Sequence, residues 1–406
     1  MLTNRVIVLG VTGSIAAYKA ADIASKLIQE GALVDVVMTE AATRFVTPLT
    51  MRSVTRRPVF VDMFDPASEL AEEHVELARR ADAVLVAPAT ATTIARLAHG
   101  LADDVVSLTV LATQAPVLVA PAMDSQMYEN AATQANLAML RERGMIIVGP
   151  AEGRLASGRL GPGRLVDTDV LLGALRCVLG QRGDLAGRKI VVSAGGTREP
   201  LDPVRFIGNY SSGKMGYALA GAAHDRGAEV VLVSAATALA PPFGVTVVPV
   251  GRAAEMRDAV AAHCQDADAL IMAAAVADYE PASPAEHKIK RKGEAMVIEL
   301  RETPDILGSV KGDFVRVGFA AESRELEENA RDKLQRKGLD LIVANDITAP
   351  GSGFGSDTNQ VVILDASGGA ERLPLLSKRQ VADRILDRVV PLLEGRGKEG
   401  RGDDNP

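Results

Sequence analysis

Two series of short apolar runs organise this chain. The runs of the first series are almost continuously apolar and lie at residues 5–10, 33–38, 83–88, 116–120 and 145–149. Such runs are typical of parallel strands that are covered on both faces. Between the first two runs, Ile15, Ile23 and Leu27 fall on one helical face, and Gly31 closes the helix. This order of strand, helix and strand predicts a doubly wound parallel sheet.

A polar stretch at residues 180–189 separates the two series. The runs of the second series lie at residues 189–194, 229–234, 245–250, 269–274, 315–320 and 340–344. The pattern therefore predicts two Rossmann-like α/β domains, residues 1–183 and residues 184–393. Residues 394–406 are polar and rich in glycine without an apolar anchor, so we predict a disordered tail there.

Composition excludes several classes of function. Hydrophobic residues make up 47% of the 406 residues, as in ordinary globular proteins. A net charge of −7 and an aromatic content of 3% argue against a nucleic-acid-binding protein. Cys177 and Cys264 lie far apart, so neither a disulfide framework nor a zinc site is indicated. The first residues lack the charged segment of a signal peptide, and we expect a cytoplasmic protein without a membrane span.

A glycine-containing loop follows the first strand of each domain. In the first loop, Gly10 and Gly13 permit a tight turn and Ser14 stands at a helix start, which favours an anion site. The second loop, residues 193–216, contains a glycine pair and a Ser–Ser–Gly–Lys turn that also suits a phosphate or a carboxylate. Neither loop has the GxGxxG or GxxxxGK[ST] pattern. A dinucleotide-dependent oxidoreductase, the first alternative for such a fold, is therefore not supported.

The wider pattern of the first domain is more specific. GVTGSIAAYK is followed by MTEAATRFV (38–46), EEHVELARRADAVLVAPATATTIARLAHGLADD (72–104) and PAMDSQMY (121–128). Over roughly residues 4–178 this order resembles the flavin-containing cysteine decarboxylases, in particular the phosphopantothenoylcysteine decarboxylase domain. The resemblance implies a flavodoxin-like fold that binds FMN. It places the flavin phosphate near Gly13, Ser14 and Thr39, and the flavin ring near Pro88, Ala89, Thr90 and Ser107.

The same resemblance identifies His74 as the active-site base, and imidazole suits proton movement near neutral pH. Taken alone, a His beside Glu72 and Glu73 is more typical of a solvated helix. Two active-site positions depart from the family pattern. Asp124 stands where the PxMN motif has Asn, and Ser157 stands where ACGDxGxGR has a proton-donating Cys.

These departures lead to an expectation about catalysis. An ionised Asp124 would repel the substrate's carboxylate, but burial in a flavin pocket is expected to raise its pKa. Because a Ser hydroxyl is far less acidic than a thiol, Ser157 is expected to slow the reaction. We therefore predict slow decarboxylation that strengthens below neutral pH. The alternative is a flavin domain that serves only as a binding or assembly module.

The second domain carries the long motif TREPLDPVRFIGNYSSGKMG, followed by AAAVADYEP (273–281), HKIKRKGEAMVIELRETPDIL (287–307), VGFAAES (317–323) and KLQRKGLDLIVANDI (333–347). Over roughly residues 186–390 this order resembles the phosphopantothenate–cysteine ligase domain. The resemblance implies that CTP and Mg²⁺ activate 4′-phosphopantothenate as an acyl-cytidylate, which the amine of cysteine then attacks. Lys288 would help to form this intermediate and Asn209 to convert it, with Arg205 nearby. The residues implied to line the nucleotide are Asp278, Glu302, Thr303, Pro304, Asp305, Phe319, Lys333 and Lys337.

Lysine spacing in this domain suits a phosphate-rich ligand. KIKRKGEAMVIEL predicts a hairpin with Lys288 and Lys290 on one face of a strand. Lys333 and Lys337 are four residues apart and share one helical face. A solvated charged face is the alternative for each pair. The resemblance further implies a homo-oligomer, with trimers of the flavin domain and dimers of the ligase domain, that acts on small molecules and not on nucleic acid or a membrane.

Overall fold

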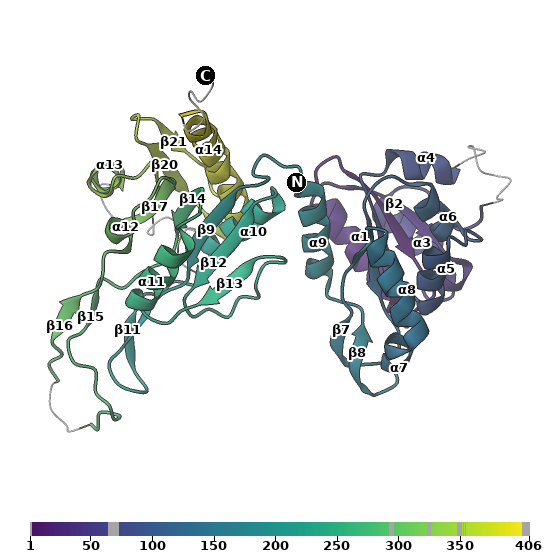
Figure 1. Ribbon diagram of the computed structural model, residues 1–406, viewed down its shortest axis with the longest axis horizontal. Coiled ribbons are helices and arrows are strands. Elements are labelled where there is room, and N and C mark those ends of the chain that lie inside the picture. Colours follow the sequence, from purple (N-terminus) through teal and green to yellow (C-terminus); the bar gives the residue numbers. More distant parts are fainter. Residues whose placement is uncertain are drawn as a thin grey trace, which may run out of the picture. The chain divides into compact units, whose positions relative to one another are not determined.

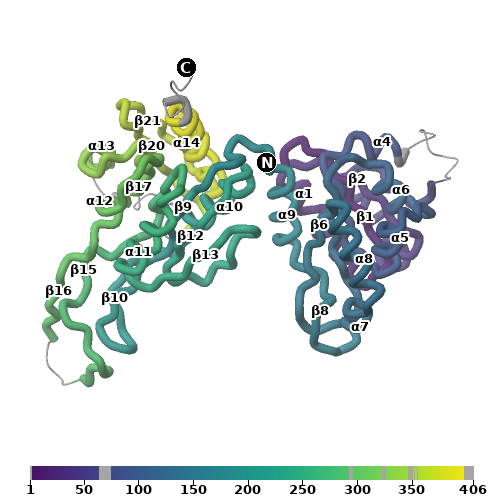
Figure 2. Tube along the Cα trace, viewed as in Figure 1, coloured from purple at the N-terminus to yellow at the C-terminus, as the bar shows by residue number. Residues whose placement is uncertain are grey.

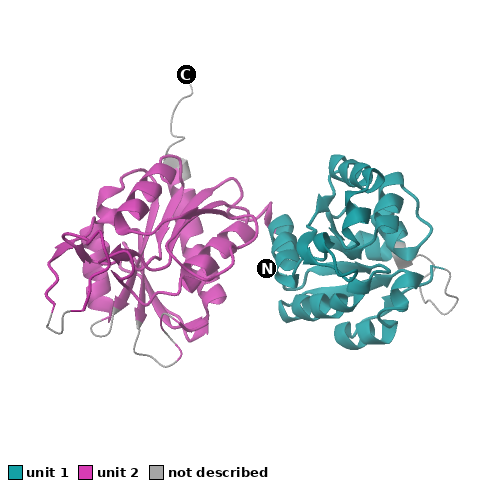
Figure 3. Cartoon of the chain, turned by 90° about the horizontal axis from the view of Figure 1, so that it is seen from below, with its two compact units in different colours: residues 1–179 teal, residues 180–406 magenta. Residues whose placement is uncertain are grey.

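The computed structural model describes residues 2–63, 73–291, 296–322, 326–346, 351, 353 and 355–399. The chain forms two compact units, residues 1–179 and residues 180–406, which Figure 3 shows in two colours. Each unit has its own sheet and its own apolar core, so each is described by itself. Within the described residues, no helix is long and apolar enough to cross a membrane.

The first unit is built on a six-stranded parallel sheet with the order β3-β2-β1-β4-β5-β6. Its strands are β1 (Val6–Val11), β2 (Leu33–Met38), β3 (Val59–Phe60), β4 (Ala83–Ala89), β5 (Val117–Pro121) and β6 (Ile146–Ile147). The five predicted runs are therefore confirmed, and β3 was not predicted. Without the two-residue β3 the order is that of a flavodoxin-like sheet, as expected.

Helices cover both faces of this sheet (Figure 1). They are η1 (Ile15–Tyr18), α1 (Lys19–Gln29), α2 (Glu40–Thr43), α3 (Pro48–Thr55), α4 (Glu73–Arg80), α5 (Ala91–His99), α6 (Val105–Ala112), α7 (Ser125–Glu129), α8 (Ala131–Glu142) and α9 (Thr168–Gly180). Side chains of α1, α3 and α9 pack into one apolar cluster, and those of α4, α5, α6 and α8 pack into another. An antiparallel hairpin, β7 (Ala151–Arg154) and β8 (Leu160–Arg164), precedes α9.

The second unit has an eight-stranded sheet with the order β13-β12-β9-β14-β17-β18-β20-β21. Its strands are β9 (Lys189–Ala194), β12 (Glu229–Ser234), β13 (Thr246–Pro249), β14 (Ala269–Met272), β17 (Val315–Glu322), β18 (Leu341–Asp346), β20 (Val361–Asp365) and β21 (Ala370–Arg372). The first six strands of the order are parallel, and they confirm all six predicted runs. The antiparallel β20 and β21, which were not predicted, extend the edge.

Helices also cover this second sheet, and short strand pairs lie outside it. The helices are α10 (Lys214–Asp225), α11 (Ala253–His263), α12 (Ile306–Ser309), α13 (Leu326–Lys337) and α14 (Lys378–Glu399). The short strands are β10 (Arg198–Pro200) with β11 (Phe206–Gly208), β15 (Tyr279–Pro281) with β16 (Leu300–Glu302), and β19 (Thr358–Asn359) with β22 (Leu376–Ser377). Figure 2 shows the chain leaving the sheet through β15 and returning through β16.

Two sequence predictions for this unit are wrong in part. Residues 288–291 and 296–299 form no strand. The antiparallel pairing involves instead the residues on either side of this segment, β15 and β16. The strand pattern of KIKRKG is thus not used, and residues 292–295 lie outside the described part. The predicted disorder from residue 394 is contradicted up to Glu399, because α14 continues to that residue. Residues 400–406 are not described.

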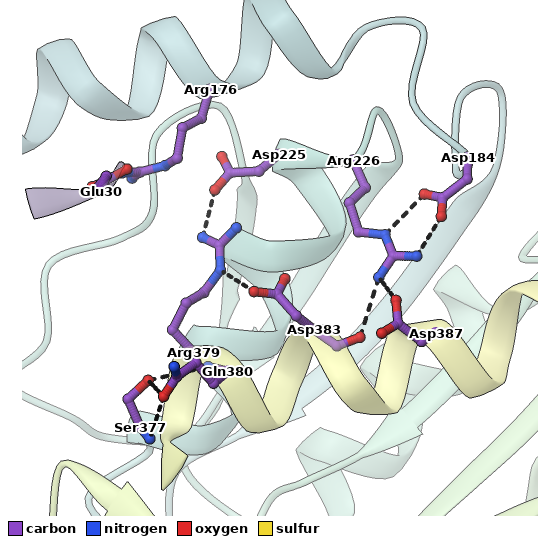
Figure 4. Close-up of polar contacts among 10 residues, drawn as sticks. All are labelled: Glu30, Arg176, Asp184, Asp225, Arg226, Ser377, Arg379, Gln380, Asp383 and Asp387. Atoms are coloured by element: carbon purple, nitrogen blue, oxygen red, sulfur yellow. Dashed lines mark hydrogen bonds and ion pairs between the residues drawn. The ribbon is translucent and has the colours of Figure 1, made fainter. Parts of the chain in front are cut away.

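Ion pairs that each contain one buried partner fix α14 to its neighbours (Figure 4). The Arg226 side chain is only 9% exposed. Its guanidinium donates to Asp184, to the Asp387 carboxylate at 2.8 Å and to the carbonyl oxygen of Asp383 at 3.2 Å. A second guanidinium, that of Arg379, pairs with the buried Asp225 at 2.5 Å. These contacts join α10 to α14 on one face of the sheet.

Candidate active sites

The first candidate site lies where three loops meet at the carboxyl edge of the first sheet. In the order β3-β2-β1-β4-β5-β6 the connections reverse direction between β1 and β4, which is where doubly wound sheets bind ligands. Ser14 follows β1, Thr39 follows β2 and Thr90 follows β4. Each of the three caps a helix and accepts a backbone N–H from its first turn. The structure thus gathers hydroxyl and N–H groups at one edge.

Thr12, which the sequence did not single out, joins two of these loops. Its side chain is fully buried; its hydroxyl donates to the carbonyl oxygen of Pro88 at 2.7 Å and accepts the N–H of Thr90 at 3.0 Å. Gly13 brings the third loop close, because a Cβ at that position would lie 2.5 Å from the Cβ of Ala41. The contacts of Thr12 and Gly13 therefore fix the three loops relative to one another. Ala89 lies beside them at the end of β4.

Ser107 and His74 are less directly placed. Ser107 is buried, and its hydroxyl donates to the Asp104 carboxylate at 2.9 Å in the N-terminal capping box of α6. Ser107 also lines a cavity of about 200 Å³ with Arg96 and Arg143. His74 belongs to α4, but its side chain is outside the described residues.

The hairpin β7–β8 closes on the segment after β5. Met123 donates its backbone N–H to the carbonyl oxygen of Gly163 at 3.0 Å. The hydroxyl of Ser157 donates to Oδ2 of Asp124 at 2.5 Å. The two residues that depart from the family pattern are therefore hydrogen-bonded to each other.

The raised pKa expected for Asp124 is wrong. The hydrogen bond from Ser157, with that from the N–H of Gln126 and the charge of Arg159, lowers the pKa of Asp124 below its ordinary value. Asp124 is only partly buried, so burial does not outweigh these contacts. The carboxylate is ionised at neutral pH.

The second candidate site is a cavity of about 920 Å³ in the second unit. It lies at the carboxyl ends of β14, β17 and β18 and at the first residues of α10. The sequence-predicted residues that line it are Asn209, Asp278, Glu302, Thr303, Pro304, Asp305, Phe319, Lys333 and Lys337. The structure therefore brings together segments that lie far apart in the sequence.

Polar contacts position several of these side chains. The Asn209 amide donates to the carbonyl oxygen of Val276 at 3.1 Å, and Lys333 donates to that of Phe319 at 2.9 Å. Lys337 forms an ion pair with Asp305. Burial favours a raised pKa for Asp305, but the hydrogen bond from Lys337 helps to lower the pKa overall.

Lys288, Lys290 and Arg205 are placed differently. Lys288 and Lys290 are exposed and do not line this cavity. Arg205 donates to Asp202 at 2.6 Å and to the carbonyl oxygen of Ile289 at 2.6 Å. The N–H of Ile289 in turn donates to Asp202 at 3.1 Å. Arg205 and the buried Asp202 thus anchor the segment that carries the two lysines.

Sequence reasoning missed Lys378 at this cavity. Lys378 begins α14 and is 7% exposed; it donates to the carbonyl oxygen of Gly353 at 3.1 Å and to that of Ser356 at 2.5 Å. Burial and the charge of Lys214 lower its pKa. Because Lys378 reaches the cavity only through the fold, no local motif could have identified it.

Comparisons with known proteins agree with this division into two sites. Residues 1–177 match the family model "Flavoprotein", and residues 185–392 match "DNA/pantothenate metabolism flavoprotein C-terminal domain". The Coenzyme A biosynthesis bifunctional protein CoaBC of Vibrio vulnificus is 48% identical over 398 residues, 97% of this chain and 99% of that protein. Its counterpart in Bacillus subtilis is 45% identical over 404 residues, 98% of this chain and 100% of that protein.

Solved structures are also similar to parts of the chain. The C-terminal domain of a Coenzyme A biosynthesis bifunctional protein CoaBC is 44% identical, with a TM-score of 0.46 over 52% of this chain and 99% of that one. A mutant PPC decarboxylase complexed with pantothenoylaminoethenethiol is 29% identical, with a TM-score of 0.39 over 43% of this chain and 97% of that one.

Proposed function

The chain belongs to the family of bifunctional coenzyme A biosynthesis proteins, and on that premise we propose how its two units divide the two reactions. Residues 184–393 ligate cysteine to 4′-phosphopantothenate, and residues 1–183 decarboxylate the product with the help of FMN. The substrates are small molecules.

The cavity of about 920 Å³ carries the ligase assignment. Two of its lysines, Lys333 and Lys337, offer positive charge where a nucleoside triphosphate would place its phosphates. We assign CTP as that nucleotide. The first step joins the substrate's carboxylate oxygen to the α-phosphorus and releases pyrophosphate. The amine of cysteine then attacks the acyl carbon, and CMP leaves.

Lys288 and Asn209 act in these two steps. The family resemblance assigns Lys288, on the segment that Arg205 anchors outside the cavity, to the negative charge that builds on the phosphate oxygens during the first step. It assigns Asn209, at the cavity, to conversion of the acyl-cytidylate. Among the described residues, no group of three or more His, Cys, Asp or Glu side chains is placed to hold a metal ion. Mg²⁺ at such sites is typically held by the phosphates of the nucleotide together with one or two carboxylates.

The loop edge of the first unit fits FMN. Hydroxyl and N–H groups at Ser14 and Thr39 suit the flavin phosphate, and the close approach at Gly13 leaves room for only a hydrogen on that residue. When bound, the flavin supplies two-electron oxidation of the cysteine moiety, which prepares the loss of CO₂. Pro88, Ala89, Thr90 and Ser107 would lie at the ring, and His74 on α4 would accept the thiol proton.

Partial reactions test the ligase assignment. With 4′-phosphopantothenate, CTP and Mg²⁺, Lys288→Ala should slow formation of the acyl-cytidylate at least ~10-fold, as expected for loss of one charged contact. Asn209→Ala should form the acyl-cytidylate and accumulate it when cysteine is added. Lys311→Ala, which removes an exposed lysine that the resemblance does not assign to the nucleotide, is the matched control. Release of CDP instead of CMP and pyrophosphate would refute the mechanism.

Assembly and location complete the proposal. The family resemblance supports trimers of the flavin unit and dimers of the ligase unit, working in the cytoplasm. Light scattering of the purified chain checks this assembly, since a monomer at micromolar concentration would contradict it.

A further inference from the structure

The tip of the β7–β8 hairpin belongs to the wall of the flavin site. The segment on which the hairpin closes is itself tied to that site, because Ala122 donates its N–H to the carbonyl oxygen of Ala89 at 3.0 Å. The hydroxyl of Ser14 donates to the carbonyl oxygen of Ala122 at 3.3 Å. A substrate that reacts at the flavin therefore lies within reach of the hairpin.

Asp124 is not suited to receive the carboxylate of that substrate. Its Oδ1 accepts the N–H of Gln126 at 3.1 Å, and its Oδ2 accepts the hydroxyl of Ser157 at 2.5 Å. Both oxygens are thus engaged, and a negative charge at this position repels a second carboxylate. A cation must take that role if the substrate is to bind at this wall.

Arg159 lies two residues after Ser157 on the same hairpin. Its side chain is exposed, and its carbonyl oxygen accepts the N–H of Leu155 at 2.8 Å, which closes the tip into a tight turn. Its charge contributes to the lowered pKa of Asp124, after the hydrogen bonds from Ser157 and Gln126. A guanidinium presents a planar fork of N–H donors that matches a carboxylate.

We propose that Arg159 binds the carboxylate of the decarboxylase substrate, and that Asp124 and Ser157 are positioning residues that hold the hairpin, and with it Arg159, at the flavin site. The inference rests on the proposed decarboxylation by this unit. Because the carboxylate leaves as CO₂, Arg159 binds the substrate but not the product. Its loss should raise KM more than it lowers kcat.

A pair of ligands tests this assignment by direct binding to the FMN-loaded full chain. N-(4′-phosphopantothenoyl)serine keeps the carboxylate but has no thiol to oxidise, and 4′-phosphopantetheine has no carboxylate. The ratio of their dissociation constants measures recognition of the carboxylate. Arg159→Gln should reduce the preference for the carboxylate ligand ~10- to 100-fold, the range for hydrogen bonds to a charged group.

Matched variants separate recognition from general damage. Arg154→Gln removes an exposed arginine from β7 and should leave the preference unchanged. Ser157→Ala should reduce the preference and raise KM, and Ser157→Thr, which keeps the hydroxyl, should restore both. Ligation by the second unit reports on the integrity of each preparation.

The outcomes are distinguishable. If Arg159→Gln keeps the wild-type preference, or if Arg154→Gln loses as much, the inference is overturned. If the wild type binds neither ligand and releases no CO₂ while ligation is intact, the proposed decarboxylation fails and the inference fails with it.

Discussion

Replacing Gly163 by alanine tests whether decarboxylation needs the β7–β8 hairpin in its closed position. Gly163 has φ +136°, and an added Cβ would lie 2.2 Å from the carbonyl oxygen of Met123. Gly158 on the same hairpin has φ +84°, but an added Cβ there would have nothing within 4 Å. Both substitutions place a Cβ at a positive φ, and only Gly163→Ala adds a clash with the segment beneath.

The size of the effect follows from these contacts. To restore an ordinary contact the hairpin must move away by about 1 Å, which stretches the 3.0 Å hydrogen bond between Met123 and Gly163. Beyond the penalty of a side chain at positive φ, strain and the weakened hydrogen bond together cost about 2–4 kcal/mol. The ratio of closed to open hairpin should therefore fall a further ~30- to 800-fold relative to Gly158→Ala.

Release of CO₂ from the carboxylated substrate is the assay, and ligation by the same preparation is the control for folding. Decarboxylation should fall further in Gly163→Ala than in Gly158→Ala, by up to the same ~30- to 800-fold, with ligation unchanged in both. Equal decarboxylation rates in the two variants would refute the reasoning, because the clash with Met123 would then have no consequence.

Two further predictions concern buried groups of the second unit. Arg226→Met should lower the free energy of unfolding by about 2–3 kcal/mol, below the full cost of a broken buried pair, because Asp184 and Asp387 are each about half exposed. Urea unfolding followed by ligase activity measures this, with the more exposed Arg257→Met as the control, and an equal effect in the control would contradict the prediction. Burial raises the pKa of Cys264 to about 12, so its thiol should resist a thiol reagent at pH 8 in the folded chain and react after denaturation. Labelling of Cys264 before unfolding, detected by peptide mass, would count against this.

The parallel strands could be predicted because their environment is uniform. β4 is buried at every position and β9 at all but one, so an apolar run alone indicates a strand covered on both faces. The short antiparallel pairs could not be predicted in this way. β7 and β8 are polar and rich in glycine, and their pairing depends on the turn between them and on the segment around Met123. The alternating pattern of KIKRKG wrongly predicted a strand because it carries no information on tertiary contacts. The backbone of Ile289 is hydrogen-bonded to the side chains of Asp202 and Arg205 instead of to a neighbouring strand.

The candidate sites contain both kinds of residue: some have a local sequence signal, and others are brought together only by the fold. Gly13, Ser14 and Thr39 stand directly after predicted strands, so a local pattern was enough to propose them. Lys333 and Lys337 could be placed on one helical face, but their meeting with Asp305 and Phe319 is a property of the fold. Lys378 has no local sequence signal, because it lies more than 30 residues from any of the residues predicted to line the nucleotide.

The error over Asp124 shows why a motif cannot supply a pKa, and it leads to a prediction about pH. No local pattern indicates that Ser157 donates a hydrogen bond to Asp124, with Gln126 and Arg159 adding to its effect. These contacts lower the folded-state pKa below the ordinary value of about 3.9, so the carboxylate is ionised throughout the range from pH 5.5 to 8. Any change that depends on its protonation is confined to lower pH.

Acidification from pH 8 to 5.5 should therefore not relieve the repulsion between Asp124 and the substrate's carboxylate. The ratio of kcat/KM for decarboxylation between the wild type and Asp124→Asn should stay constant across this range, because only the wild type carries the titrating group. Other groups affect both proteins alike and cancel in the ratio. A ratio that rises more than ~3-fold toward pH 5.5 would mean that Asp124 takes up a proton there, and that its pKa is raised by the substrate rather than lowered by Ser157.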